Sequence, residues 1–442
     1  MAFLTSSDKA LWHLALPMIF SNITVPLLGL VDTAVIGHLD SPVYLGGVAV
    51  GATATSFLFM LLLFLRMSTT GLTAQAYGAK NPQALARVLV QPLLLALGAG
   101  ALIALLRTPI IDLALHIVGG SEAVLEQARR FLEIRWLSAP ASLANLVLLG
   151  WLLGVQYARA PVILLVVGNI LNIVLDVWLV MGLHMNVQGA ALATVIAEYA
   201  TLLIGLLMVR KILKLRGISG EMLKTAWRGN FRHLLALNRD IMLRSLLLQL
   251  CFGAITVLGA RLGSDIIAVN AVLMTLLTFT AYALDGFAYA VEAHSGQAYG
   301  ARDGSQLLDV WRAACRQSGM IVALLFSVVY LLAGEHIIAL LTSLTQIQQL
   351  ADRYLIWQVI LPLVGVWCYL LDGMFIGATR AAEMRNSMAV AAAGFALTLL
   401  TLPWLGNHGL WLALTVFLAL RGLSLAAIWR RHWRNDTWFV AT

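Results

Sequence analysis

The sequence predicts an all-α polytopic membrane protein of twelve transmembrane helices, and three observations carry this prediction. Only 11 % of the 442 residues are charged and 61 % are hydrophobic, whereas an ordinary soluble domain carries about 25 % charged residues. The mean hydropathy of the chain is +0.88. Apolar runs continue for about 20 residues, the length that a helix needs to cross a bilayer, and they lack the strict alternation of a membrane β-barrel.

Twelve apolar stretches follow one another along the chain, and we expect each to form one spanning helix. They are residues 11–36, 44–72, 88–107, 131–154, 161–183, 188–210, 240–262, 266–297, 313–334, 354–378, 387–405 and 409–429. Most connections between them are short, but a polar, basic segment interrupts the chain midway. We therefore expect an N-terminal lobe (1–210), a cytoplasmic linker (211–239), a C-terminal lobe (240–430) and a cytoplasmic tail (431–442).

The basic residues predict the orientation of the helices. Lys and Arg are enriched in the cytoplasmic connections of membrane proteins. With a cytoplasmic N-terminus, most of the 29 Lys and Arg residues fall on the cytoplasmic side, Arg421 included; Arg66 and Arg244 lie within spans and are left uncounted. Both termini are therefore expected in the cytoplasm. Because the basic residues punctuate apolar runs, the net charge of +8 reflects topology rather than a nucleic-acid partner.

The sequence lacks the motifs of several other protein classes. The three cysteines are far apart, which disfavours a zinc site or a disulfide framework. There is no GxxxxGK[ST] phosphate-binding loop, no HExxH and no nucleophile elbow. The histidines follow no metal-ligand spacing. We expect neither an enzyme nor a bound cofactor or metal.

An internal repeat divides the chain into two similar halves. The pentapeptide QAYGA occurs at 75–79 and at 297–301, a shift of 222 residues. Further matches are Pro140 with Pro362 at 222, Gly150 and Gly154 with Gly373 and Gly377 at 223, and Gly189 with Gly409 at 220. These matches predict a duplicated unit of six helices. Because six is even, the two copies enter the membrane from the same side and form parallel repeats, as in many transporters.

Two acids in the first half are candidate proton-coupling residues, since ionisable groups are costly in lipid. Asp32 follows Pro17 and Pro26, each of which removes a backbone donor and is expected to bend the first helix. Asp176 shares one helix face with Asn172. The alternatives are an acid near the membrane interface for Asp32 and hydrogen bonding between helices for Asp176.

The repeat strengthens the functional interpretation of these acids. At the shift of 222, Asp32 aligns with Ala254. The stretch 387–405, which corresponds to 161–183 in the second copy, contains no acid. A purely architectural residue would more readily recur in both copies. Asn145 and Thr194 are candidates to join the same polar cluster.

Acids in the second half receive less weight. Asp372 and Glu292 are candidates for an ion or substrate site in the C-terminal lobe. Asp285 of the second half is a similar case, and so is Glu198 of the first half. Asp372 is followed by Gly373 and Gly377, which permit close helix packing.

At these residues the sequence resembles the MATE (multidrug and toxic compound extrusion) family, and most of all its DinF branch. The resemblance covers nearly the whole chain. It is carried by LALP at 14–17, VDT at 31–33, GHL at 37–39, GNILNIVLDVWLV at 168–180, GAALAT at 189–194, both QAYGA turns and GATR at 377–380.

The resemblance implies two six-helix lobes around a central cleft and export of organic, often cationic or amphipathic, compounds from the bacterial cytoplasm across the inner membrane. An inward flow of H⁺ or Na⁺ drives this antiport by alternating access. The family's roles fall on Asp32 and Asp176 for the proton, on Asn145, Asn172 and Thr194 for substrate or cation binding, and on Pro17, with Pro26 added, for helix bending.

One departure from the family pattern favours H⁺ over Na⁺. Sodium-coupled relatives place a glutamate in the seventh helix, where this chain has Gln249, although Asp372 matches the acid of the tenth helix. Na⁺ coupling and a lipid-linked oligosaccharide flippase of related fold remain the alternatives. A flippase calls for a large cationic cavity, which two in-span arginines do not supply. We expect a monomer and, from the family, a part in the stress response.

Overall fold

The computed structural model describes residues 5–440 except 38, 40 and 230, and it leaves the side chains of residues 24–33 outside the description. The helices are α1 (Ser6–Ile36), α2 (Pro42–Leu61), α3 (Phe64–Gly78), α4 (Pro82–Leu105), α5 (Arg107–Val118), α6 (Glu122–Arg135), α7 (Ala139–Gly154), α8 (Arg159–Asp176), α9 (Asn186–Leu215), α10 (Gly220–Thr225), α11 (Arg232–Arg261), α12 (Ser264–Gly300), α13 (Gly304–Ala314), α14 (Ala323–Leu341), α15 (Thr345–Gly377), α16 (Ala381–Thr398), α17 (Leu402–Leu405) and α18 (Asn407–Arg434). Short 3₁₀ segments are η1 (Trp136–Ser138) and η4 (Leu399–Thr401), and π-helical segments are η2 (Val177–Gly182) and η3 (Cys315–Val322).

The predicted all-helical membrane fold is confirmed. Within the described part of the chain, 11 helices are long and apolar enough to cross a membrane. They coincide with the predicted stretches from 44–72 to 409–429. The first predicted stretch, 11–36, lies in α1, whose side chains are described only in part.

The chain forms two compact units. One consists of residues 24–234, and the other of residues 1–23 together with 235–442. The sequence places the first 23 residues in the N-terminal lobe, whereas the structure packs them with the C-terminal unit.

Side-chain contacts tie the start of α1 to the C-terminal unit. Asp8 is almost fully buried and accepts a hydrogen bond from Arg316 Nη2 at 3.0 Å. The Trp12 indole donates to Gln317 at 2.8 Å, and the Asn22 amide donates to the Tyr282 carbonyl at 3.2 Å. These bonds link α1 to η3 and α12, so the first turns of α1 are part of that unit's packing.

Thr5 and Asp8 cap the N-terminus of α1. The Thr5 N–H donates to Asp8 Oδ2, and the Asp8 N–H donates to Thr5 Oγ1, which satisfies two backbone donors at the helix end. Burial raises the pKa of the Asp8 carboxyl. Hydrogen bonds from Thr5 and Arg316 outweigh burial, so its pKa lies below the ordinary value.

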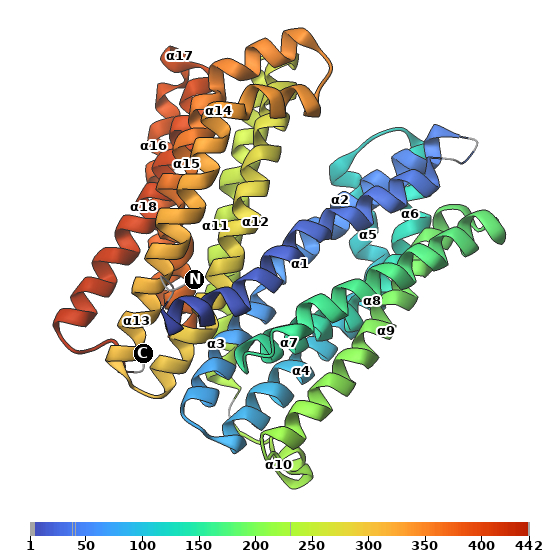
Figure 1. The fold of residues 1–442 in the computed structure, drawn as a ribbon. Coiled ribbons are helices and arrows are strands. Elements are labelled where there is room, and N and C mark those ends of the chain that lie inside the picture. The colour runs from blue at the N-terminus through green and yellow to red at the C-terminus, as the bar shows by residue number, and fades with distance from the viewer. Residues whose placement is uncertain (1–4, 38, 40, 230, 441–442) are drawn as a thin grey trace. The chain divides into compact units, whose positions relative to one another are not determined.

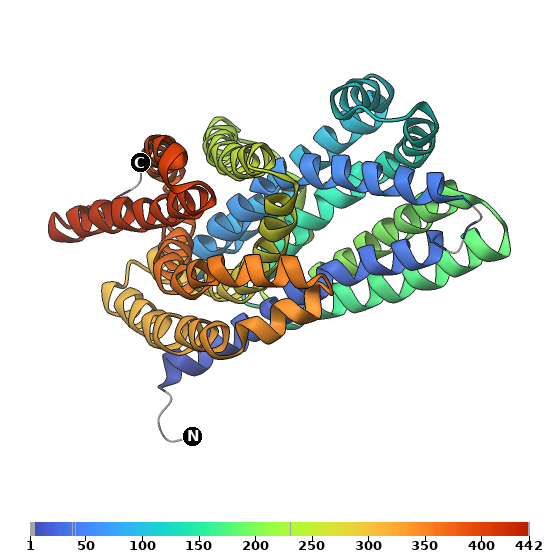
Figure 2. The same cartoon turned by 90° about the horizontal axis from the view of Figure 1, so that it is seen from above.

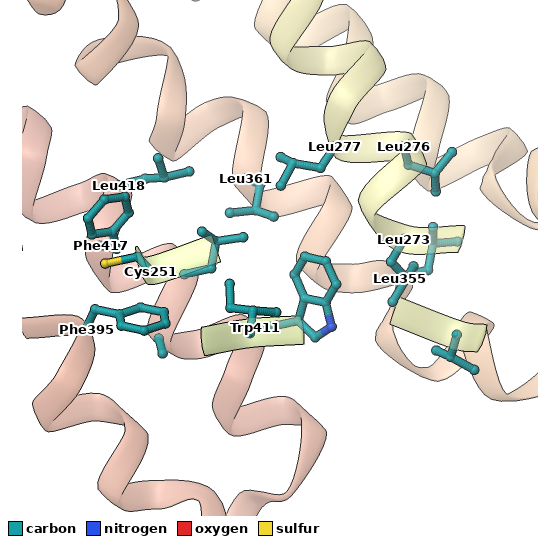
Figure 3. Packing of buried hydrophobic residues seen from close by; sticks show 14 of the residues in the cluster. Cys251, Leu273, Leu276, Leu277, Leu355, Leu361, Phe395, Trp411, Phe417 and Leu418 are labelled. Carbon is teal, nitrogen blue, oxygen red and sulfur yellow. The ribbon is translucent and has the colours of Figure 1, made fainter. Parts of the chain in front are cut away.

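In the unit of residues 24–234, α7 packs against α3, α4 and α9. Helices α8 and α9 lie side by side along their length, as both views show (Figures 1 and 2). In the C-terminal unit, α15 packs against α12, α14 and α18, and α16 packs against α18. Figure 3 shows the apolar core of this unit, where Trp411 lies among leucines and Phe395 and Phe417 lie near Cys251.

The glycine matches confirm the internal repeat in three dimensions. A Cβ on Gly150 would lie 2.7 Å from the Arg66 carbonyl oxygen, and a Cβ on Gly373 would lie 2.7 Å from the Ala288 carbonyl oxygen. Arg66 and Ala288 are themselves 222 residues apart in the sequence. Each copy therefore packs the same pair of helices at the same glycine, α3 with α7 and α12 with α15.

Candidate functional site

Asp176 lies at a change of helix type. It is the last residue of α8, and the chain continues directly as the π-helix η2. The residue is 0 % exposed. π-Helical turns occur often at functional sites, because the extra residue shifts the faces of the helix that follows. The Asp176 carboxyl group is thus buried at the point where the α-helix changes to a π-helix.

Asn172 lies one turn before Asp176 and bonds to α9. Its Nδ2 donates to Thr194 Oγ1 at 3.2 Å, and the Thr194 hydroxyl donates in turn to the Ala190 carbonyl at 3.2 Å. Both side chains are buried. The Asn172 Oδ1 is buried with no hydrogen-bond partner among the described residues. The structure therefore brings Asn172 and Thr194 together beside the turn that carries Asp176.

Asn145 bonds to a different acid. Its Nδ2 donates to the Glu198 carboxylate at 3.0 Å and to the Glu198 carbonyl at 3.2 Å. Thr194 and Glu198 are four residues apart, so they occupy one face of α9. The polar residues of α7 and α8 thus meet the same face of α9. The spacing of Thr194 and Glu198 was visible in the sequence, and it would have justified treating Glu198 as a stronger candidate site residue.

The predicted residues of the first helix can be placed only in part. Asp32 and Pro26 lie in α1, but their side chains are outside the described ones. Pro17 is half-buried in α1, which runs from Ser6 to Ile36 without interruption. The bending roles of Pro17 and Pro26 and the proton role of Asp32 stay predictions.

Asp372 forms a buried ion cluster in the C-terminal unit. Its Oδ2 accepts a hydrogen bond from Arg244 Nη2 at 2.7 Å and another from Arg421 Nη2. All three residues are at most 7 % exposed. Two guanidinium groups therefore compensate one carboxylate inside the unit.

The position of Arg421 corrects the sequence analysis, which counted it among the cytoplasmic residues. Arg421 is only 4 % exposed and lies near the middle of α18, where it binds Asp372. The predicted stretch 409–429 already contained Arg421, but the sequence alone did not show that a distant acid pairs with it inside the lobe. A buried guanidinium is accommodated here because an acid on α15 offsets its charge.

Glu292, the other candidate of the second lobe, lies in α12 and is buried. Gly377 of α15 packs against the backbone beside it, since a Cβ there would lie 2.9 Å from the Glu292 carbonyl oxygen. Across the described residues, no three His, Cys, Asp or Glu side chains gather closely enough to hold a metal ion.

Comparison with known proteins places this architecture in one family. The MatE family model matches residues 17–178 and 241–404, one match in each half of the chain. The chain is 98 % identical over 442 residues to DNA damage-inducible protein F of Escherichia coli K12, covering 100 % of this chain and 96 % of that protein. It is 23 % identical to a probable multidrug resistance protein NorM of Acinetobacter baylyi, covering 97 % and 96 %.

Solved structures share the fold. A MATE protein crystallised in a bent conformation superimposes with a TM-score of 0.84 at 21 % identity, covering 98 % of this chain and 96 % of that one. An outward-facing multidrug resistance MATE transporter of the MOP superfamily gives a TM-score of 0.82 at 22 % identity, covering 98 % and 97 %. This chain therefore belongs to the MATE family of multidrug efflux transporters and is a multi-pass membrane protein, not an enzyme.

Proposed function

We propose that the protein is a proton-coupled antiporter that exports small cationic or amphipathic organic compounds by alternating access. It works as a monomer in the bacterial inner membrane with both termini in the cytoplasm. Protons flowing inward through the N-terminal lobe drive the export. The proposal includes the central cleft that the family resemblance implies.

The observation that carries the proposal is the full burial of Asp176 one helical turn after Asn172, whose amide binds Thr194. The Asp176 carboxyl is fully buried, and Asn172, one helical turn before it, donates through its amide to the Thr194 hydroxyl of α9. Desolvation favours the neutral form of such an acid, and hydrogen-bond donors favour the charged form. A small change in these neighbours therefore shifts its proton affinity, which is what proton coupling requires.

Proton binding drives transport only if it favours one conformation over the other. In our proposal Asp32 loads a proton first, and loss of its charge removes its need for polar partners. The helix then bends at Pro17 and Pro26, and Asn172 and Asp176 supply contacts that differ between the two states. Related MATE proteins have been crystallised in a bent and a straight conformation, which supports assigning such a change to this chain.

The ion cluster of the C-terminal unit argues against sodium coupling there. A Na⁺ site needs oxygen ligands with spare negative charge. The carboxylate of Asp372 instead binds Arg244 and Arg421, so a further cation at this carboxylate would be repelled. Because Arg244 and Arg421 are both paired with Asp372, part of their positive charge is neutralised. They therefore do not supply the large cationic cavity that a flippase needs.

The proposal is tested in liposomes that contain the purified protein. Efflux of ethidium is followed under an imposed pH gradient and, separately, under an imposed Na⁺ gradient. We expect a response to the pH gradient alone, abolished in Asp32→Asn, reduced at least about tenfold in Asp176→Asn and unchanged in Asp309→Asn, which alters an exposed acid. Wild-type coupling in Asp32→Asn, or transport driven by Na⁺ alone, contradicts the proposal.

A further inference from the structure

The C-terminal end of α18 borders a groove that the transport mechanism does not use. Two adjoining hollows, of about 520 Å³ and 440 Å³, share Ala426, Arg430 and Arg434 in their walls. The second hollow is also lined by Trp311 of α13 and Leu371 of α15. We call these two hollows together the α18 groove; the end of α18 and the neighbouring α13 can be seen in Figure 1.

The α18 groove changes from apolar to cationic along the helix. Leu423 and Ala427 line one end, and Arg430, Arg431 and Arg434 line the other. The three arginines are exposed, and none of the described residues that line the groove is acidic. The 28 residues of α18 extend for about 42 Å at the rise of an α-helix, which exceeds the roughly 30 Å of hydrocarbon. The arginines therefore lie at the level of the lipid headgroups.

Tryptophans form the wall beside the arginines. The ring centroids of Trp311 and Trp429 are 5.6 Å apart, as are those of Trp429 and Trp433. Tryptophan is enriched where membrane meets water, because its ring is apolar and its N–H is polar. The Trp429 Nε1 is buried and has no hydrogen-bond partner among the described residues. The tryptophan rings thus mark the boundary between the apolar and cationic ends.

The first copy of the repeat carries the same charges without the same space. At the shift of 220 that aligns Gly189 with Gly409, the arginines match Arg210, Lys211 and Lys214. Ala426 and Ala427, however, match Leu206 and Leu207. Two large side chains in the first copy are therefore replaced by two methyl groups in the second. Positive charge at this level follows from membrane topology in both copies, but the small residues that open the groove belong to the second alone.

We propose that the α18 groove binds an acidic phospholipid. The phosphate lies among the guanidinium groups of Arg430, Arg431 and Arg434, which suit its oxygens by charge and by their paired donors. The rings of Trp429 and Trp433 pack beside the headgroup, where the apolar and cationic ends of the groove meet. One acyl chain follows Ala427 and Leu423 toward the hydrocarbon. Basic pockets between spanning helices are known to hold anionic headgroups in this way.

The test measures lipid binding by native mass spectrometry of the full-length protein, purified in detergent and titrated with phosphatidylglycerol or phosphatidylcholine. We expect the first phosphatidylglycerol to bind at least about tenfold more tightly than phosphatidylcholine, since each basic residue near an anionic surface adds a factor of about five. The triple variant Arg430→Gln/Arg431→Gln/Arg434→Gln removes this preference. The matched control Arg210→Gln/Lys211→Gln/Lys214→Gln, which removes the same charge from the first copy, keeps it.

A second variant tests the space independently of the charge. Ala426→Leu/Ala427→Leu restores the residues of the first copy and keeps all three arginines, so it is expected to weaken phosphatidylglycerol binding about tenfold. Equal binding of the two lipids, or an unchanged preference in this filled variant, overturns the proposal. Displacement of phosphatidylglycerol by millimolar inorganic phosphate also overturns it, because the groove is then a site for free phosphate.

Discussion

Asp176 in the unit of residues 24–234 is buried one helical turn after the Asn172–Thr194 hydrogen bond, whereas Asp372 in the C-terminal unit accepts hydrogen bonds from two buried arginines. Both acids are buried in a chain that spans the membrane. An acid compensated by two fixed cations suits a permanent link between helices. An acid buried one turn from an amide–hydroxyl hydrogen bond suits a group that changes its protonation state. The duplicated unit has thus kept its helix packing in both copies while its buried polar chemistry has diverged.

The largest effect on stability is expected at Asp372. Asp372→Ala leaves the guanidinium groups of Arg244 and Arg421 buried without their shared acceptor, which costs about 3–5 kcal/mol. Thermal unfolding in detergent measures this loss, and Asp309→Ala, at an exposed position, serves as the control. If Asp372→Ala unfolds at the same temperature as the wild type and the control, the ion cluster does not hold the helices of the C-terminal unit together.

A smaller effect is expected in the first lobe. Thr194→Val keeps the shape of the side chain but removes the oxygen that accepts from Asn172 Nδ2, and a buried donor without a partner costs about 1–3 kcal/mol. Thr194→Ser retains the hydroxyl and is expected to stay close to the wild type. The pH dependence of ethidium efflux should shift in Thr194→Val and not in Thr194→Ser. Identical pH profiles would separate this hydrogen bond from proton coupling.

The smallest effect concerns the anchor of α1. The pKa of Asp8 is lowered on folding, so its contribution to stability is present above its unfolded pKa and is lost as the pH falls toward the folded pKa. Because Arg316 is 44 % exposed, solvent screening limits the contribution to about 1 kcal/mol. Asp8→Asn should therefore unfold earlier than the wild type at pH 7, with the difference shrinking near pH 3. A difference that persists unchanged at pH 3 would assign the effect to packing.

Two kinds of pattern predicted the helices and the repeat: apolar runs and periodicities within one segment, and motifs that recur at a nearly constant shift. Apolar runs located the spans, and the glycine pairs at 150 and 154 and at 373 and 377 predicted close packing that the structure confirms. Asn172 and Asp176 were recognised for the same reason, since they share one face of a single helix.

Contacts between distant segments could not be predicted from these patterns. Arg244 and Asp372 are 128 residues apart, and Asp8 and Arg316 are 308 apart. No periodicity links such pairs. The pairing of Arg421 with Asp372 and the packing of the first turns of α1 against η3 therefore could not be read from the sequence.

The comparison between the lobes is tested most directly by counting the protons that a substrate displaces. Purified protein in weakly buffered detergent is mixed with ethidium, and proton release is read with a pH indicator. We expect release from the wild type and from Asp309→Asn, no release from Asp32→Asn, and a reduced amount from Asp176→Asn. Undiminished proton release from a protein that lacks both Asp32 and Asp176 would contradict the assignment of proton coupling to the first lobe.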